Sequence, residues 1–262
     1  MQARLGIAMV DDLLEIGGAP CAPYLRAVLP RILLSCTCSS PPSDAPRTAH
    51  EISVSAQVCG CRAAPDDDLR QAALFGVGLA AGMGGAEFTP YAVEAVQVLR
   101  HVAGQPDARG EDKESATDNA VASLARVAAR HADALPPHAV AEIWAEWLAY
   151  LPLKADVAEA AVVHKELAHH VIAGHVGVLG AENGNLPRVV AVMAQVLETD
   201  LVDAEGTAAI RDALAALHAR APQLLDAACQ ALSPPLLQRL QNCATAPGAA
   251  PGAAPALQQP VG

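Results

Sequence analysis

Apolar residues recur at spacings of three and four along most of the chain, and each such run ends at a proline, a glycine or a polar cluster. This period is that of an amphipathic α-helix, and no run of strict apolar and polar alternation competes with it. The predicted helices cover residues 2–16, 22–36, 66–83, 89–103, 115–131, 137–150, 156–173, 185–199, 205–220, 223–232 and 235–242. The sequence therefore predicts an all-α protein.

The starts of these predicted helices carry suitable residues. Pro23, Pro90 and Pro187 fall in first turns, where a missing backbone N–H costs nothing. Asp156 and Glu205 place acids near the positive end of a helix dipole. These local signals support the helix boundaries that the apolar period predicts.

A longer period runs through alternate helices. Val77, Leu124, Leu167 and Leu214 occupy equivalent places at intervals of 47, 43 and 47 residues. These intervals are within or close to the period of HEAT-type helical pairs, in which each pair buries one face by stacking on its neighbours. We therefore expect a HEAT-repeat α-solenoid of stacked antiparallel helix pairs.

Two segments depart from this period. Residues 37–64 are rich in Ser, Pro and Cys, and we expect an irregular, disordered insertion between the helical residues 1–36 and the main solenoid at 65–243. Residues 244–262 consist largely of Ala, Pro, Gly and Gln, and they cannot bury enough apolar surface to order themselves. We expect a disordered tail there.

Composition and charge narrow the possible functions. Apolar residues make up 52% of the chain and aromatic residues only 3%, which favours helix formers over strand formers. The formal net charge is −11, from 28 acidic and 17 basic residues, which argues against nucleic-acid binding and suits basic protein partners. The longest uncharged stretch, 71–86, is shorter than the ~20 apolar residues of a membrane-spanning helix. The seven cysteines, an odd number, favour a reducing compartment.

Five segments, in this order, resemble the late repeats of one protein family. They read QARLGIAMVDDLLEIG at 2–17, DDDLRQAALFGVG at 66–78, ATDNAVASLARV at 116–127, WLAYLPLKAD at 147–156 and LGAENGNLPR at 179–188. The chain resembles the carboxy-terminal HEAT repeats of the importin-beta family of nuclear transport receptors, in its importin-5 (karyopherin beta-3) branch. The resemblance covers about 2–242, except 37–64.

This resemblance implies a function without catalysis and without a cofactor. It implies a receptor of the cytoplasm and nucleus that carries basic cargo, such as histones or ribosomal proteins, and binds Ran GTPase and pore nucleoporins as a full-length protein. It also implies that the helix at 66–83 is an inner helix whose outer partner is 22–36. The inner helix at 2–16 then lacks a partner, and we expect it to expose an apolar face.

The inner helices of such a solenoid line its concave surface, where acidic residues can bind Lys- and Arg-rich cargo. The acids predicted on these helices are Asp11, Asp12, Glu15, Asp67, Asp68, Asp118, Asp156, Glu159 and Asp212. For each single residue, the alternative is a helix-start or solvated surface charge. The prediction concerns their collective field.

Trp144 and Trp147 lie three residues apart on one helix face, where a nucleoporin groove is possible but core packing is favoured.

A group of glycines has a simpler explanation than nucleotide binding. The glycines between 76 and 85 favour close helix packing over a phosphate loop, because no strand precedes them.

The possible zinc ligands have unsuitable spacings. His164, His169, His170 and His175 lack the spacing of a metal-binding pair, and Cys36, Cys38, Cys59 and Cys61 lack that of the usual zinc knuckle. There are two alternatives to a transport receptor. One is a stand-alone HEAT scaffold, and the other is a metal-dependent hydrolase, which a measurement of bound zinc would test.

Overall fold

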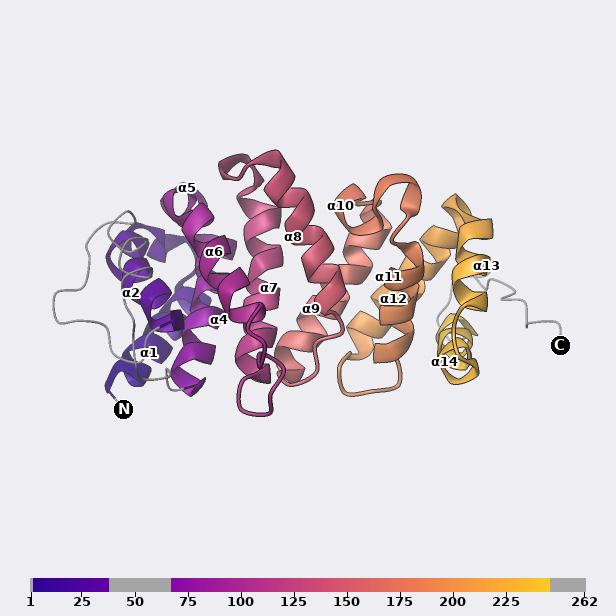
Figure 1. Cartoon of the computed structure of the whole chain (residues 1–262), viewed down its shortest axis with the longest axis horizontal. Coiled ribbons are helices and arrows are strands. Elements are labelled where there is room, and N and C mark those ends of the chain that lie inside the picture. Colours follow the sequence, from indigo (N-terminus) through magenta and orange to yellow (C-terminus); the bar gives the residue numbers. More distant parts are fainter. Residues whose placement is uncertain (1, 38–66, 246–262) are drawn as a thin grey trace. The chain divides into compact units, whose positions relative to one another are not determined.

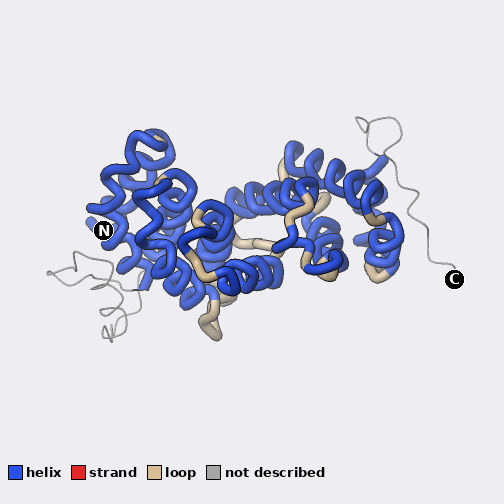
Figure 2. The backbone as a smooth tube through the Cα atoms, turned by 90° about the horizontal axis from the view of Figure 1, so that it is seen from above, coloured by secondary structure: helices blue, strands red, loops and turns tan. Residues whose placement is uncertain are grey.

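The computed structural model describes residues 2–37 and 67–245 and has two compact units, Met1–Ile143 and Trp144–Gly262. The described residues form helices and the loops between them, and none of them lies in a strand (Figures 1 and 2). The predicted all-α class is therefore confirmed. The boundary between the units falls inside helix α8, so each unit is described by itself.

The first unit holds two rows of helices. α4 packs against α1 on one side and α7 on the other, while α2 packs on α4 and α6 packs on α7. The elements are α1 (Gln2–Gly17), η1 (Ala19–Tyr24), α2 (Leu25–Thr37), α4 (Asp67–Met83), α5 (Gly85–Phe88), η2 (Thr89–Tyr91), α6 (Ala92–Ala103), α7 (Glu114–Arg130), η3 (Ala132–Ala134) and the start of α8 (Pro137–Tyr150).

The second unit repeats this arrangement of packed helices. α9 packs on α12, and α11 packs on α13 and α14. Its elements, after the end of α8, are α9 (Val157–Ala173), α10 (Val176–Leu179), η4 (Ala181–Asn183), α11 (Leu186–Val196), α12 (Ala204–Arg220), α13 (Pro222–Gln230) and α14 (Pro234–Thr245).

Polar side chains join α7 to α4 at regular places in the first unit. Ser123 Oγ donates a hydrogen bond to the Leu74 carbonyl at 2.9 Å, and His131 Nε2 donates to the Ala81 carbonyl, also at 2.9 Å. These partners are 49 and 50 residues apart in the sequence. Both bonds satisfy buried polar groups, so they fix how α7 lies along α4.

Arginines join helices that pack against one another in the second unit. Arg220 donates to the carbonyls of Val171 and Ile172 at the end of α9, and Arg239 donates to the Gln195 carbonyl at the end of α11. The last carbonyls of a helix have no partner within that helix, and a basic side chain that binds them also suits the negative end of the helix dipole. Each arginine therefore caps the carboxyl end of one helix and attaches its own, later helix to that end.

The residues that revealed the long period are all core residues. Val77, Leu124, Leu167 and Leu214 are buried, on α4, α7, α9 and α12. Within the units, α4 packs on α7 and α9 on α12, as stacking at this period requires. The helical stacking of a solenoid is therefore found in the described residues, while the HEAT type of the repeats stays a prediction.

Two predicted helix starts are wrong by about one turn, for the same reason. Pro23 lies in the 3₁₀ helix η1 and Pro90 in η2, so that α2 begins at Leu25 and α6 at Ala92. Proline is accepted in the first turn of either kind of helix, and a tight 3₁₀ turn often precedes an α-helix. Each proline correctly marked the start of a helix, but it could not show whether that helix is a 3₁₀ helix or an α-helix.

Another difference concerns α11, which ends at Val196, before the predicted end at 199. Thr199 Oγ1 donates to the Val196 carbonyl at 2.6 Å and accepts from the Leu201 N–H at 3.2 Å. Such local bonds compete with helix formation. The short helices α5 and α10 were not predicted, since four residues hold no detectable period.

The two predicted disordered segments lie outside the described residues almost entirely. Of the insertion at 37–64, only Thr37 is described, as the last residue of α2. Of the tail at 244–262, residues 244 and 245 are described, and they end α14. Both expectations stay predictions.

Two glycines of α4 provide a matched test of the packing between α4 and α7. A Cβ on Gly78 would lie 2.5 Å from Ser123 Oγ and 2.8 Å from Arg126 Nη1, whereas a Cβ on Gly82 would meet nothing within 4 Å. Gly78→Ala should therefore destabilise the protein by about 1–3 kcal/mol, as overpacking does. Gly82→Ala should stabilise it by about 0.5–1 kcal/mol, because alanine favours a helix. Urea unfolding followed by circular dichroism measures both, and equal effects would contradict the close packing at Gly78.

Candidate protein-binding surface

Three of the nine acids predicted to bind cargo are buried. Asp11, Asp118 and Glu159 are only 6%, 0% and 5% exposed. A partner protein cannot reach these carboxylates without opening the fold, so the prediction is corrected for these three residues. The helical period placed them on inner helices, but it could not show that they face a neighbouring element.

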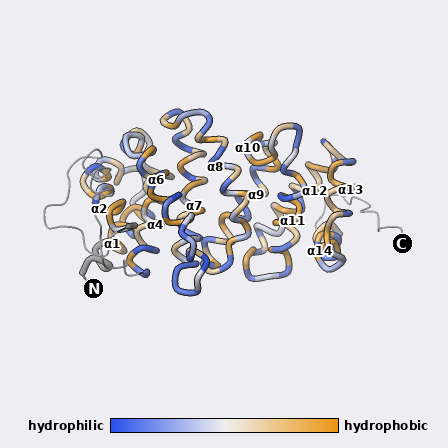
Figure 3. Tube along the Cα trace, viewed as in Figure 1, coloured by the Kyte–Doolittle hydropathy of each residue, from blue (hydrophilic) through white to orange (hydrophobic). Residues whose placement is uncertain are grey.

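Asp118 holds the loop that joins α6 to α7. Arg109 Nη1 of this loop lies 2.6 Å from Asp118 Oδ1 and 3.6 Å from Glu114 Oε1. Thr117 Oγ1 donates to the Ala108 carbonyl at 2.7 Å. The loop itself is strongly hydrophilic (Figure 3). Asp118 thus acts within the fold, as the anchor of a polar loop.

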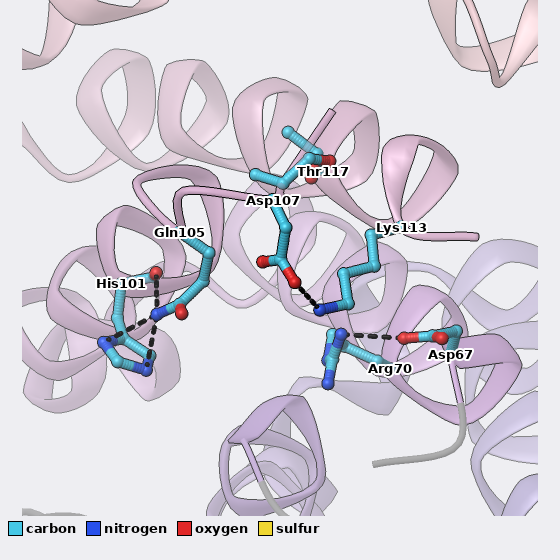
Figure 4. Close-up of polar contacts among 8 residues, drawn as sticks. Asp67, Arg70, His101, Gln105, Asp107, Lys113 and Thr117 are labelled. Carbon is cyan, nitrogen blue, oxygen red and sulfur yellow. Dashed lines mark hydrogen bonds and ion pairs between the residues drawn. The ribbon is translucent and has the colours of Figure 1, made fainter. Parts of the chain in front are cut away.

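A second group of charges lies where this loop meets α4 (Figure 4). Arg70 Nη1 lies 2.8 Å from Asp67 Oδ1, and Lys113 pairs with Asp107. The hydrogen bond from Lys113 lowers the pKa of the Asp107 carboxyl. Asp67 is therefore partly neutralised by its own helix and contributes less to an acidic field than its sequence position indicates.

Asp11 lies against α4 at a position without a side chain. A Cβ on Gly76 would lie 2.3 Å from Asp11 Oδ1, so the glycine makes room for the carboxyl group. Asp11 Oδ1 is buried and has no hydrogen-bond partner among the described residues. Burial, and after it the carboxylates of Asp12 and Glu15, raise the pKa of Asp11 to about 7. The cause is that a buried carboxylate is poorly solvated.

Four of the predicted acids are exposed and stay candidates for partner binding. Asp12 and Glu15 lie on the outside of α1, Asp68 lies in the first turn of α4, and Asp212 lies on α12 in the second unit. Asp156 is the N-cap of α9, and its Oδ1 accepts the Glu159 N–H at 3.1 Å. Its role is explained by helix capping.

Exposed apolar residues lie beside the exposed acids of α1, and the sequence did not predict them individually. Met9, Leu13 and Ile16 are exposed on α1, beside Asp12 and Glu15. The expectation that this helix exposes apolar residues is therefore confirmed. Their spacing of four and three was visible in the sequence, but it is equally typical of a buried face.

The two tryptophans lie in the core of the second unit. Trp144 and Trp147 are buried, with ring centroids 5.5 Å apart in an edge contact. His170 lies 4.9 Å and His175 4.7 Å from the Trp144 ring. The favoured prediction of core packing is confirmed, and these rings form one aromatic cluster.

His164 has a structural role in the same unit. Its Nε2 accepts the Leu153 N–H at 3.2 Å, and its Nδ1 donates to the Leu201 carbonyl at 2.8 Å. The ring therefore joins the loops before α9 and before α12. Among the residues that the structure describes, no group of three His, Cys, Asp or Glu side chains is arranged to hold a metal ion. Of the four cysteines considered for zinc, only Cys36 is described, and it is buried.

The chain is similar over part of its length to a known protein. It is 34% identical over 108 residues to a probable importin-5 homolog of Dictyostelium discoideum. The aligned residues make up 39% of this chain and 10% of that protein, so the chain matches about a tenth of its relative's length. No family model matches the sequence. No helix in the described residues is long and apolar enough to cross a membrane.

Replacing Asp11 tests the cost of burying its carboxyl group. An unfolded aspartate has a pKa of about 3.9, so the folded protein binds more protons than the unfolded chain between pH 4 and 7. The contribution of Asp11 to stability is therefore full below about pH 4 and is lost as the pH rises to 7. Asp11→Asn should raise the unfolding midpoint in urea at pH 7.5 and not at pH 4.

Burial also raises the pKa of Glu94 to about 7. The stability of the Asp11→Asn variant should therefore still depend on pH in part. Asp133→Asn, at an exposed position of the same unit, is the control. An Asp11→Asn protein with the stability profile of the parent would contradict the raised pKa.

His170 should make the second unit sensitive to acid. Burial, followed by the charges of His175 and His169, lowers the pKa of His170 to about 4. An unfolded histidine has a pKa of about 6.5, so stability falls as the pH drops from about 6.5 to 4. Tryptophan fluorescence should show this loss, because both tryptophans belong to the cluster. His170→Phe should weaken the pH dependence, whereas the exposed His218→Gln should leave it unchanged.

Proposed function

We propose that this chain is a protein-binding part of a nuclear transport receptor and holds basic segments of cargo proteins on exposed acids of its inner helices. The observation that carries the proposal is the similarity to an importin-5 homolog. The stacked helices support it, because such stacks offer long surfaces to partner proteins. In this proposal the chain binds proteins and catalyses no reaction.

The distribution of charge supports basic partners. The net charge of −11 repels nucleic acid and attracts Lys- and Arg-rich proteins over long distances. Of the predicted acids in the first unit, Asp12, Glu15 and Asp68 reach the surface. These three form the proposed cargo-binding set of that unit. In the second unit, Asp212 is a separate exposed candidate.

The finer parts of the proposal come from the resemblance of the five segments to the importin-beta family. Cargo of the histone or ribosomal-protein type, Ran GTPase and nucleoporins are the proposed partners of the full-length receptor, which would act in the cytoplasm and nucleus. A stand-alone helical scaffold is the alternative function. The salt dependence and the charge preference of binding distinguish the two, because a scaffold need not select basic partners.

A direct binding measurement tests the cargo proposal. A Lys- and Arg-rich peptide should bind the full chain at low salt and should bind more weakly at 0.15 M salt, where charges further apart than about 8 Å are screened. Neutralising Asp12, Glu15 and Asp68 together, with Asn and Gln, should weaken binding at low salt about tenfold, at about 0.5 kcal/mol for each exposed pair.

The matched control neutralises three other exposed acids, Glu111, Asp133 and Asp200, and so changes the net charge equally. It should weaken binding clearly less. An equal loss for both variants would show that net charge alone attracts the peptide. A folded chain that ignores basic peptides would contradict the cargo proposal and favour the scaffold.

A further inference from the structure

Two histidine rings lie together in the second unit. The ring centroids of His170, near the end of α9, and His175, just before α10, are 4.9 Å apart, with 59° between the ring planes. Trp144 contacts both rings, with its centroid 4.9 Å from that of His170 and 4.7 Å from that of His175. Both histidines are half-buried, so solvent reaches the edge of this histidine pair.

A left-handed turn brings the two histidines together. α9 ends at Ala173, and Gly174 follows with a φ of 69°. The His175 N–H donates to the His170 carbonyl at 2.9 Å, and the Gly174 N–H donates to the Val171 carbonyl at 3.0 Å. These two bonds form a Schellman motif, which ends a helix and turns the chain. Residues five apart on a continuous helix point in different directions, so the sequence spacing alone did not predict the pair.

A glycine on the other side of His175 also fixes its position. A Cβ on Gly177 would lie 2.6 Å from Trp144 Cδ1 and 3.0 Å from His175 Cε1. Only a residue without a side chain lets the backbone of α10 lie against both rings. The His175 ring is therefore held between two backbone segments, and a side chain that is already ordered loses little entropy when it binds a ligand.

The nitrogens of His175 differ from those of the buried histidines described above. His131 Nε2 donates to the Ala81 carbonyl, and both ring nitrogens of His164 are hydrogen-bonded. His175 Nδ1 is buried and has no hydrogen-bond partner among the described residues. A buried polar atom without a partner calls for an explanation, and a bound ion is one of them. The unprotonated imidazole nitrogen is the commonest metal ligand of proteins.

We infer that His170 and His175 bind one divalent transition-metal ion of the class that prefers imidazole ligands, which includes Ni²⁺, Cu²⁺ and Zn²⁺. Two imidazoles that bind one tetrahedral ion through metal–nitrogen bonds of about 2.0–2.1 Å place their ring centroids about 5 Å apart. The separation of 4.9 Å in this pair fits that geometry. Water completes the coordination, because no group of three His, Cys, Asp or Glu in the described residues is arranged to hold an ion.

Tryptophan fluorescence tests the inference on the full chain, because both of its tryptophans lie beside the His170 ring. Ni²⁺ is the probe, since its unpaired electrons quench fluorescence at short range and it does not oxidise thiols. After dialysis against EDTA and then against plain buffer, Ni²⁺ should quench the emission along a saturating curve. Saturating Ni²⁺ should also raise the unfolding midpoint in urea, because an ion bound to the folded chain stabilises it.

Substitutions connect both effects to the histidine pair. His170→Phe and His175→Phe each keep an aromatic ring and remove its nitrogens. Each variant should lose the saturable quenching and the Ni²⁺-dependent rise of the urea midpoint, and circular dichroism without Ni²⁺ checks its folding. His218→Phe, which removes an exposed histidine of α12 in the same unit, is the matched control and should keep both effects.

The other outcomes overturn the inference. A folded parent chain without saturable quenching has no ion site beside the tryptophans. Quenching that stays unchanged in both variants of the pair places the ion elsewhere. A loss in only one of the two variants assigns the ion to a single histidine and so contradicts a shared site. The cargo proposal is independent of these outcomes, because basic peptides can be tested in the presence of EDTA.

Discussion

The structure depends on one constraint, which is that no helix of this chain can bury its apolar side alone. In the first unit α4 lies between α1 and α7, and its glycines let both neighbours approach. Ser123 and His131 then bind backbone carbonyls of α4, so close packing leaves no unsatisfied polar group at those two places. The stability of each helix therefore depends on its neighbours, as in repeat proteins. The exposed faces are those that no neighbouring helix covers.

This constraint also decides which charges can meet a partner. Asp118 is an inner-helix acid by its position in the sequence, but Arg109 pairs with it beneath the loop between α6 and α7. Asp11 is covered in the same way by α4. The acids that remain outside, above all Asp12 and Glu15, lie beside exposed apolar residues. In our proposal, the acids that stay exposed are the ones that contact a basic partner.

The aromatic and histidine residues of the second unit follow the same logic. Trp144, Trp147 and His170 fill the interior with rings, and His164 joins two loops through both of its nitrogens. In the described residues of this unit, these side chains serve packing and hydrogen bonding within the fold.

The sequence by itself determined the class of the fold and most of the helices. Its apolar period of three to four residues is produced by the geometry of the helix, so helices as long as α7 and α9 could be predicted. The long period placed Val77, Leu124, Leu167 and Leu214 in the core, because equivalent positions of stacked helices are buried alike. Local chemistry was visible in part: Asp156 was predicted near the positive end of a helix, and it is the N-cap of α9.

Only the tertiary structure decided which side of each helix faces a neighbour. Leu13 and Leu14 both fit an apolar spacing of three and four residues along α1. Leu14 is nevertheless buried, and Leu13 is exposed. The same holds for the acids Asp11 and Asp12, which are adjacent in the chain. Burial depends on residues of other helices that are distant in sequence. Gly76, for example, has no side chain and so leaves room for Asp11. For this reason the sequence could propose acids for a binding surface, while packing decided which of these acids are exposed.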